Sequence, residues 1–190
     1  NDLSSNEDAD HDDHDHSEHS HGDENAHVWM NLADYQIQVQ NICNGLSEAD
    51  SAHAEQYAKN AQTYQGKVQE LQQEAAELAS QIASQPVVIF HEAYEYIVQE
   101  YGLQLAGEMN LDERQVSAGE VADILHSIED NHVSVVLAEE LYGTDMGEMV
   151  AKQSGVKVVY LDTLTRGDYS ADSYLEGMRS NIEQLKEAFQ

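Results

Sequence analysis

The sequence predicts an α/β protein with a four-stranded, mainly parallel sheet and flanking helices. A long rigid linker helix and a disordered tail rich in histidine and aspartate are expected to precede this sheet. Three observations support the prediction. Apolar runs alternate with helical patterns in the second half of the chain, a long amphipathic stripe precedes them, and the first residues are almost devoid of apolar side chains.

Residues 1–26 mix histidine densely with acidic residues, and we expect them to be disordered because they are too polar to bury a core. Imidazole is a common ligand of divalent transition metals, and carboxylates assist it as harder ligands. The tail is therefore predicted to capture metal ions through His11, His14, His16, His19 and His21. A solvated acidic linker is the alternative interpretation of this composition.

The net charge of −29, with 8 Lys and Arg against 37 Asp and Glu, limits the partners of the chain. Phosphate contacts need clustered cations, so the charge argues against nucleic acid and against an anionic membrane surface. Cations are the natural partners, because a long-range negative field raises their local concentration. The single cysteine, Cys43, excludes an internal disulfide and a cysteine-based zinc site. No sequence motif of a known active site occurs, so we expect neither an enzyme nor a catalytic substrate.

Apolar residues at helical spacing predict two helices before the sheet. Residues 27–50 contain a short helix whose apolar face is formed by Leu32, Tyr35, Val39, Ile42 and Leu46. Residues 51–84 continue the stripe and predict a helix about 45 Å long, which ends before Pro86. A coiled coil and a rigid strut laid across a domain both fit this stripe, and its small alanine positions favour the strut.

Residues 85–190 alternate four apolar runs with four helical patterns. The runs are 87–90, 103–109, 133–138 and 158–161, and helices are expected over 92–101, 118–131, 144–154 and 171–188. Continuous apolar runs are typical of strands buried on both faces. Ser117 and Glu120 form a capping box, and Gly102 and Gly155 stand where helices end. Four strand–helix units in a row imply a parallel sheet with right-handed crossovers.

Metal-competent side chains follow three of the predicted strands. His91 comes directly after the first strand, Glu139 after the third and Asp162 after the fourth. Ligands of open parallel sheets bind outside the carboxyl ends of the strands. The sequence therefore predicts a metal site that includes His91 and Asp162. We expect Glu139 to lie at the rim or to support a ligand, rather than to bind the ion itself.

Five segments along the chain resemble one family: NAHVWMN, FHEAYEYIVQEYGL, SAGEVADIL, VVYLDTL and DSYLEGMRSNIEQL. They are similar, in this order, to the carboxy-terminal portion of metal-binding solute-binding proteins of zinc and manganese ABC importers, and most of all to the zinc-specific branch. The resemblance implies two α/β lobes joined by one long rigid helix, with the metal between them. It assigns residues 1–26 to the end of an acidic His-rich loop, 27–50 to the end of a missing amino-terminal lobe, 51–84 to the linker helix and 85–190 to the carboxy-terminal lobe.

The resemblance also implies three metal ligands. His27 matches the histidine of the family's HVW segment, His91 that of its FH-x-A-Y motif, and Asp162 the carboxylate of an LDP-like turn, in which Thr163 replaces the usual proline. Manganese favours oxygen ligands, and the manganese branch typically has glutamate at the His91 position, so His91 favours zinc over manganese. We expect His27 to be held less rigidly than His91, because the helix after it would pack in the other lobe.

This family implies an extracytoplasmic protein, periplasmic or lipid-anchored at the cell surface. As a monomer it would capture zinc and deliver it to the membrane permease of an ABC importer. Two alternatives stay open: a free-standing metal buffer or storage module, and an interaction protein that uses the long helix as a coiled coil. No apolar run is long enough to span a bilayer, and a targeting signal is expected upstream of Asn1.

Overall fold

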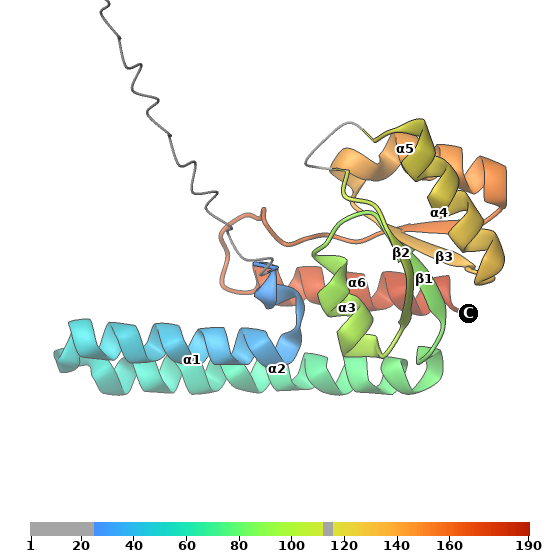
Figure 1. Ribbon diagram of the computed structural model, residues 1–190. Helices are drawn as coiled ribbons and strands as arrows, with labels where there is room; N and C mark the ends of the chain where they lie inside the picture. The colour runs from blue at the N-terminus through green and yellow to red at the C-terminus, as the bar shows by residue number, and fades with distance from the viewer. Residues whose placement is uncertain (1–24, 112–115) are drawn as a thin grey trace, which may run out of the picture.

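The computed structural model describes residues 25–111 and 116–190, in which a helical hairpin extends from one side of a four-stranded sheet (Figure 1). The five histidines of the predicted tail lie outside these described residues. The elements before the sheet are the 3-10 turn η1 (Val28–Met30), helix α1 (Leu32–Ala49), the 3-10 turn η2 (Ser51–His53) and helix α2 (Ala54–Ile82). None of the described helices is both long and apolar enough to cross a membrane.

Helix α2 contacts different partners along its length. Its first half lies beside α1, and its second half packs against the helices that cover the sheet (Figure 1). Five apolar residues of the second half are buried: Val68, Leu71, Ala75, Leu78 and Ile82. The second half of the apolar stripe thus packs within the chain, as the strut interpretation predicts.

The sheet contains four parallel strands in the order β2-β1-β3-β4. The strands are β1 (Pro86–Ile89), β2 (Gln104–Glu108), β3 (Val135–Ala138) and β4 (Lys157–Tyr160). The helices that follow them are α3 (Tyr94–Tyr101), α4 (Ala118–Asp130), α5 (Glu140–Ser154) and α6 (Ser173–Ala188). The predicted α/β class and parallel sheet are confirmed. The third of these helices begins at Glu140, four residues earlier than expected, because it follows β3 almost directly.

Helices cover both faces of the sheet. Val87 and Ile89 belong to the same apolar cluster as residues of α2, α3 and α6, whereas Val88 and Phe90 belong to a second cluster with residues of α4 and α5. Successive side chains of a strand point to opposite faces, so a strand between two helical layers must be apolar throughout. This burial explains why the strand runs show no polar alternation.

Local signals end and begin the helices as the sequence predicts. Ser117 and Glu120 form the capping box of α4, in which each side chain bonds the backbone amide of the other. Gly102 ends α3 and Gly155 ends α5, both with the positive φ that glycine adopts without strain. These short connections fix where each strand delivers the residue that follows it.

Candidate metal site

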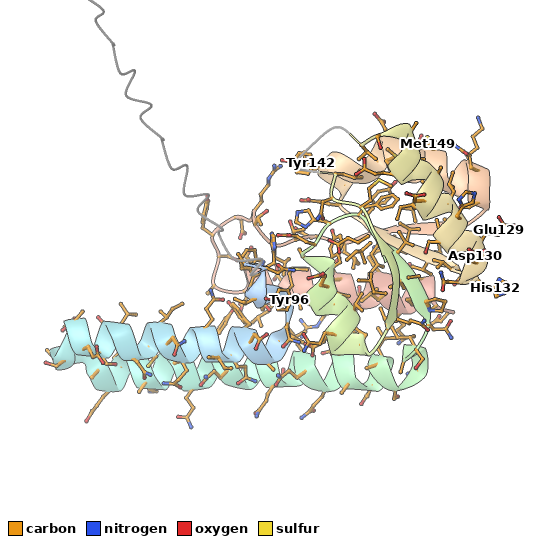
Figure 2. All side chains as sticks on the ribbon, in the orientation of Figure 1. Tyr96, Glu129, Asp130, His132, Tyr142 and Met149 are labelled. Carbon is orange, nitrogen blue, oxygen red and sulfur yellow. The ribbon has the colours of Figure 1, made fainter. Side chains whose placement is uncertain are left out.

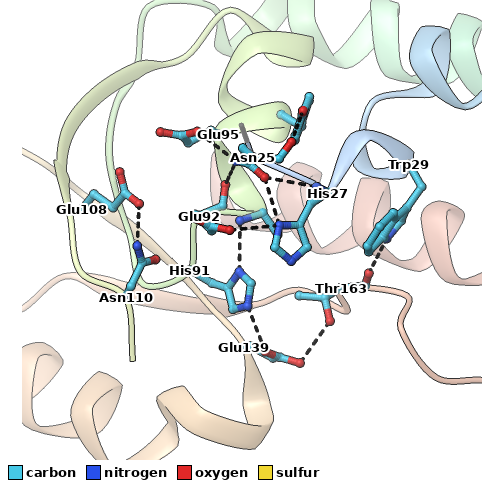
Figure 3. A network of polar contacts seen from close by, with 12 residues as sticks. Asn25, His27, Trp29, His91, Glu92, Glu95, Glu108, Asn110, Glu139 and Thr163 are labelled. Carbon is cyan, nitrogen blue, oxygen red and sulfur yellow. Dashed lines mark hydrogen bonds and ion pairs between the residues drawn. The ribbon is translucent and has the colours of Figure 1, made fainter. Parts of the chain in front are cut away.

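The segment that carries His27 is fastened to the loop after β4. The indole Nε1 of Trp29 donates a hydrogen bond of 2.8 Å to the carbonyl of Thr163 (Figure 3). The hydroxyl of Tyr174, at the start of α6, donates one of 2.7 Å to the carbonyl of Trp29. Met30, at the end of η1, is completely buried in the main apolar cluster. The HVW segment is therefore part of the packed structure of this chain.

Asn25, two residues before His27, fastens the same segment to the residues around the start of α3. The amide Nδ2 of Asn25 donates to the carbonyl of Glu92 at 2.8 Å, and the hydroxyl of Tyr96 donates to the carbonyl of Asn25 at 2.7 Å. Oδ1 of Asn25 lies 2.9 Å from Nδ1 of His27. The expectation that His27 is loosely held is wrong, because α3 and the loop after β4 bind the segment directly.

His27 and His91 lie together at the carboxyl edge of the sheet. Their ring centroids are 5.0 Å apart, and the rings meet edge to face (Figure 3). His91 is only 6% exposed, and its Nδ1 accepts a hydrogen bond of 3.0 Å from the backbone amide of Ala93. Nε2 is therefore the nitrogen through which His91 can bind a metal ion.

Glu139 lies beside this pair. Its Oε2 is 3.9 Å from Nε2 of His91, and its Oε1 accepts a hydrogen bond of 3.0 Å from the hydroxyl of the buried Thr163 (Figure 3). Thr163, which stands where the family usually has proline, thus contacts the carboxylate of Glu139.

Asp162 occupies a different position. Its backbone amide and carbonyl both bond the buried side chain of Asn181, at 2.9 and 2.8 Å. Its carboxylate oxygen Oδ1 accepts a hydrogen bond of 2.8 Å from the amide of Leu164, and the residue as a whole is exposed. The turn after β4 is firmly held, and the Asp162 carboxylate stabilises that turn.

A buried tyrosine joins the ends of two strands beneath the site. The hydroxyl of Tyr94 lies 2.6 Å from the carbonyl oxygen of Leu161 and 3.1 Å from that of Ala138. Burial, and then the nearby Glu139 and Asp162 carboxylates, raise the pKa of Tyr94 above its ordinary value, so its hydroxyl remains a donor. Tyr94 thereby fixes the two strand ends that deliver these acidic residues.

The structure brings some of the predicted residues together and leaves one apart. Within residues 25–111 and 116–190, no three His, Cys, Asp or Glu side chains are arranged closely enough to hold a metal ion. His27, His91 and Glu139 are neighbours, whereas Asp162 follows β4, which is separated from β1 by β3. Adjacent strands lie about 4.8 Å apart, so β1 and β4 are separated by about 10 Å. The ligand role of Asp162 stays a prediction.

Other histidines lie away from this group. Nδ1 of His53 bonds Asp50 at 2.7 Å near the free end of the hairpin. His132 lies with Glu129 and Asp130 at the end of α4, far from Tyr96 beside the site (Figure 2). The supporting contacts of Asn25 and Thr163 were not predicted, since they join residues more than 20 positions apart in the sequence.

These features are those of a metal-binding protein with an α/β lobe and a long helix. A family model described as "Zinc-uptake complex component A periplasmic" matches residues 2–188, and the chain belongs to this family. The family comprises metal-binding solute-binding proteins of ABC importers, which are not a class of enzymes.

Curated relatives are similar over most of this chain. The iron-binding protein YfeA of Yersinia pestis is 27% identical over 174 residues, which cover 88% of this chain and 56% of YfeA. The high-affinity zinc uptake system protein ZnuA of Bacillus subtilis is 27% identical over 167 residues, covering 85% of this chain and 52% of that protein. The chain therefore spans about half the length of these relatives.

Solved structures show the same fold. FpvC of Pseudomonas aeruginosa in complex with Ni²⁺ superposes with a TM-score of 0.77 at 26% identity, covering 87% of this chain and 63% of FpvC. A Zn(II)-bound variant of AdcAII of Streptococcus pneumoniae gives a TM-score of 0.72 at 26% identity, covering 86% of this chain and 60% of AdcAII.

Proposed function

We propose that this chain is the metal-holding part of an extracytoplasmic solute-binding protein that captures zinc and delivers it to the permease of an ABC importer. The observation that carries the proposal is the pair of imidazoles, His27 and His91, with ring centroids 5.0 Å apart at the carboxyl edge of the sheet. The protein acts as a monomer, by binding and release without catalysis, in the periplasm or anchored at the cell surface. Membership of a family described as a periplasmic zinc-uptake component supports zinc capture and the periplasmic location. The name of the zinc-binding lipoprotein AdcA of Streptococcus pneumoniae supports the alternative of an anchor at the cell surface.

Zinc is the cargo that the donor set favours. The names of the relatives YfeA and ZnuA mention iron and zinc. The similar structures of FpvC hold Ni²⁺ or Mn²⁺ and that of AdcAII holds Zn(II), so the fold alone does not select one metal. Two imidazoles suit zinc, whereas manganese favours carboxylate and other oxygen ligands. We propose His27 and His91 as ligands, with Asp162 as the carboxylate that the family pattern predicts.

The remaining parts of the chain are proposed to serve the same capture. The His-rich residues 1–26 bind further ions weakly and raise their concentration near the site. Residues 27–50 belong to the end of an amino-terminal lobe, residues 51–84 form the linker helix and residues 85–190 form the carboxy-terminal lobe. The exposed apolar side chains of α1 support this division, because a second lobe would cover them.

A chelator competition on the full chain tests the proposal. The unaltered chain is expected to hold one zinc ion more tightly than its other ions. His27→Ala and His91→Ala should both lose this ion, with affinity falling by more than the roughly 10–100-fold cost of losing a supporting contact. Because hydrogen bonds fasten the His27 segment to the rest of the chain through Asn25 and Trp29, the two losses should be similar. His53→Ala is the matched control, since its side chain is 67% exposed and distant from the site.

Manganese is titrated in the same way and is expected to bind more weakly than zinc. The tail histidines are present in every variant, so the weak ions that they hold cancel in the comparison. If His27→Ala and His91→Ala retain zinc as well as His53→Ala does, the site is elsewhere and the proposal fails.

A further inference from the structure

Trp29 lies beside His27 and is fastened to another part of the chain. The ring centroids of the two residues are 5.3 Å apart, with an angle of 59° between the rings (Figure 3). The indole Nε1 of Trp29 donates its hydrogen bond to the carbonyl of Thr163, which holds the ring against the loop after β4. The position of Trp29 therefore helps to set the position of the His27 imidazole.

The backbone carbonyl of Trp29 depends on a side chain for its hydrogen bond. In a continued helix it would accept a bond from the amide of Ala33, four residues further on. That amide instead bonds the side chain of Asn31 at 2.9 Å, because α1 begins only at Leu32. The hydroxyl of Tyr174, at the start of α6, donates to the Trp29 carbonyl in its place, at 2.7 Å. Burial, above all, raises the pKa of Tyr174, so this hydroxyl stays protonated and able to donate.

Tyr174 is joined to both helices of the hairpin. Its ring lies face to face with that of Tyr35, on α1, with ring centroids 3.6 Å apart and an angle of 21° between the rings. The hydroxyls of Tyr35 and of Tyr64, on α2, share a hydrogen bond of 3.1 Å. Tyr35, Tyr64 and Tyr174 together are called the tyrosine cluster. The cluster connects α1, α2 and α6 with the carbonyl of Trp29.

His91 is held independently of the tyrosine cluster. It follows β1, is nearly buried, and accepts the amide of Ala93 through Nδ1 at 3.0 Å. Asn25 fastens the residues before His27 around the start of α3, so loss of the cluster would loosen this segment without releasing it. Such a change would move the His27 imidazole relative to that of His91. Zinc binds imidazole nitrogens at about 2.0–2.1 Å, so even a small shift of one ring weakens the binding.

We propose that Tyr174 is a positioning residue for His27, and that Tyr35 and Tyr64 make the position of His27 depend on the helical hairpin. Tyr174 acts through the backbone of Trp29 and does not touch the ion. The inference rests on the proposed function, because it concerns how a proposed ligand is placed, and it adds no ligand to the site. It gives the hairpin a part in metal binding, since a movement of α1 or α2 against α6 would reach His27 through the cluster.

Zinc competition on the full chain tests the assignment. Tyr174→Phe removes the hydroxyl and keeps the stacked ring, and it should lower zinc affinity about tenfold, as loss of a contact that supports a ligand does. Tyr35→Phe keeps the stack but breaks the bond to Tyr64, so it should cause a smaller loss. Tyr57→Phe is the matched control, because its hydroxyl bonds Asp50 at 3.0 Å near the free end of the hairpin. It should leave zinc affinity unchanged.

A second substitution separates positioning from general support of the fold. In a chain that already carries His27→Ala, Tyr174→Phe should have no further effect on the residual zinc affinity, because it acts only through His27. A purely structural role would lower the affinity in both chains. Urea unfolding without metal checks that each variant folds.

Fluorescence gives a measurement that needs no metal. Trp29 is the single tryptophan of the chain, so the emission reports this residue alone. Tyr174→Phe should make the emission of the folded chain easier to quench with acrylamide, because the Trp29 segment is less firmly held. Tyr57→Phe should quench as the unaltered chain does.

Failure of the inference can be told apart from failure of the proposed function. If His27→Ala loses a tight zinc ion while Tyr174→Phe binds it as Tyr57→Phe does, Tyr174 does not position His27 and the proposed function stands. If the unaltered chain holds no zinc that depends on His27, both are wrong. Equal losses from Tyr174→Phe with and without His27, or unchanged quenching of Trp29, would overturn the positioning role. A Tyr35→Phe chain with unchanged zinc affinity would overturn the dependence on the hairpin.

Discussion

The two halves of α2 carry the same kind of apolar stripe but have different surroundings. From Val68 to Ile82 the stripe lies against the helices of the sheet and is buried. Before Val68 the helix lies beside α1, where Ile42 is 58% exposed and Leu46 is 45% exposed. An open groove runs between the two helices there, and its walls are mostly apolar.

The comparison of the two halves of α2 shows how much the spacing of apolar residues in the sequence can predict. The spacing of apolar residues shows which face of a helix avoids water, and both halves of α2 follow it. It does not show which part of the chain covers that face. The candidate metal site lies at the well-packed end, because Trp29 of η1 is hydrogen-bonded to the loop after β4 and to Tyr174 of α6.

The largest expected difference between the two regions is in the cost of removing one leucine. Leu71, on the second half of α2, is completely buried, so Leu71→Ala should lower the free energy of unfolding by about 2–5 kcal/mol. Leu46→Ala removes the same atoms from a half-exposed position and should cost under about 1 kcal/mol. Urea unfolding followed by circular dichroism measures both changes.

Equal losses would contradict the comparison. They would mean that the exposed face of α1 is covered in solution, for example by a second copy of the chain. Sedimentation of the unaltered chain distinguishes that case, since a stable dimer would be heavier than the expected monomer.

The parts of the fold that depend on neighbouring residues could be predicted. Four apolar runs predicted the four strands. The capping box at Ser117 predicted the start of a helix, and the glycines at 102 and 155 predicted the ends of two others, and the structure confirms all three. Each of these signals acts within one or two helical turns. His91, Glu139 and Asp162 were likewise predicted to follow strand ends, because each stands next to the run that delivers it.

The spatial order of the strands could not be predicted, and it decides which of these residues meet. The chain order β1, β2, β3, β4 becomes β2-β1-β3-β4 in the sheet, which places Glu139 beside His91 and moves Asp162 one strand further away. The hydrogen bonds of Thr163 to Glu139 and of Trp29 to Thr163 span 24 and 134 positions. No local pattern reports contacts of that kind.

The second prediction concerns the turn next to the site. Asn181 is 3% exposed and bonds both the amide and the carbonyl of Asp162, so Asn181→Ala leaves two backbone groups without these partners. The free energy of unfolding should fall by about 1–3 kcal/mol. Ser180→Ala, an exposed neighbour on α6, should change it by less than about 0.5 kcal/mol. Urea unfolding measures both changes. A loss no larger than that of Ser180→Ala would show that the two hydrogen bonds between Asn181 and the backbone of Asp162 contribute little to stability.

The smallest expected effect on the free energy of unfolding comes from Glu100, which lies where the helical hairpin joins the helices of the sheet. The carboxylate of Glu100, on α3, accepts a hydrogen bond of 3.1 Å from the backbone amide of Leu32, the first residue of α1. Burial raises the pKa of Glu100 above its ordinary value, and the hydrogen bond from Leu32 only partly opposes this. The folded protein therefore binds this proton more tightly than the unfolded chain does.

A raised pKa in the folded state means that ionisation of Glu100 destabilises the fold. Its contribution is fully present below the ordinary carboxyl pKa and is lost as the pH rises through the folded-state value. Glu100→Gln cannot ionise, so its free energy of unfolding should equal that of the unaltered chain at low pH and exceed it slightly at neutral pH. Glu77→Gln, on the exposed face of α2, measures the general benefit of removing one charge from a chain of net charge −29. Urea unfolding over this pH range gives both curves, and a Glu100→Gln curve that coincides with that of Glu77→Gln would show that the junction with α1 leaves Glu100 fully hydrated.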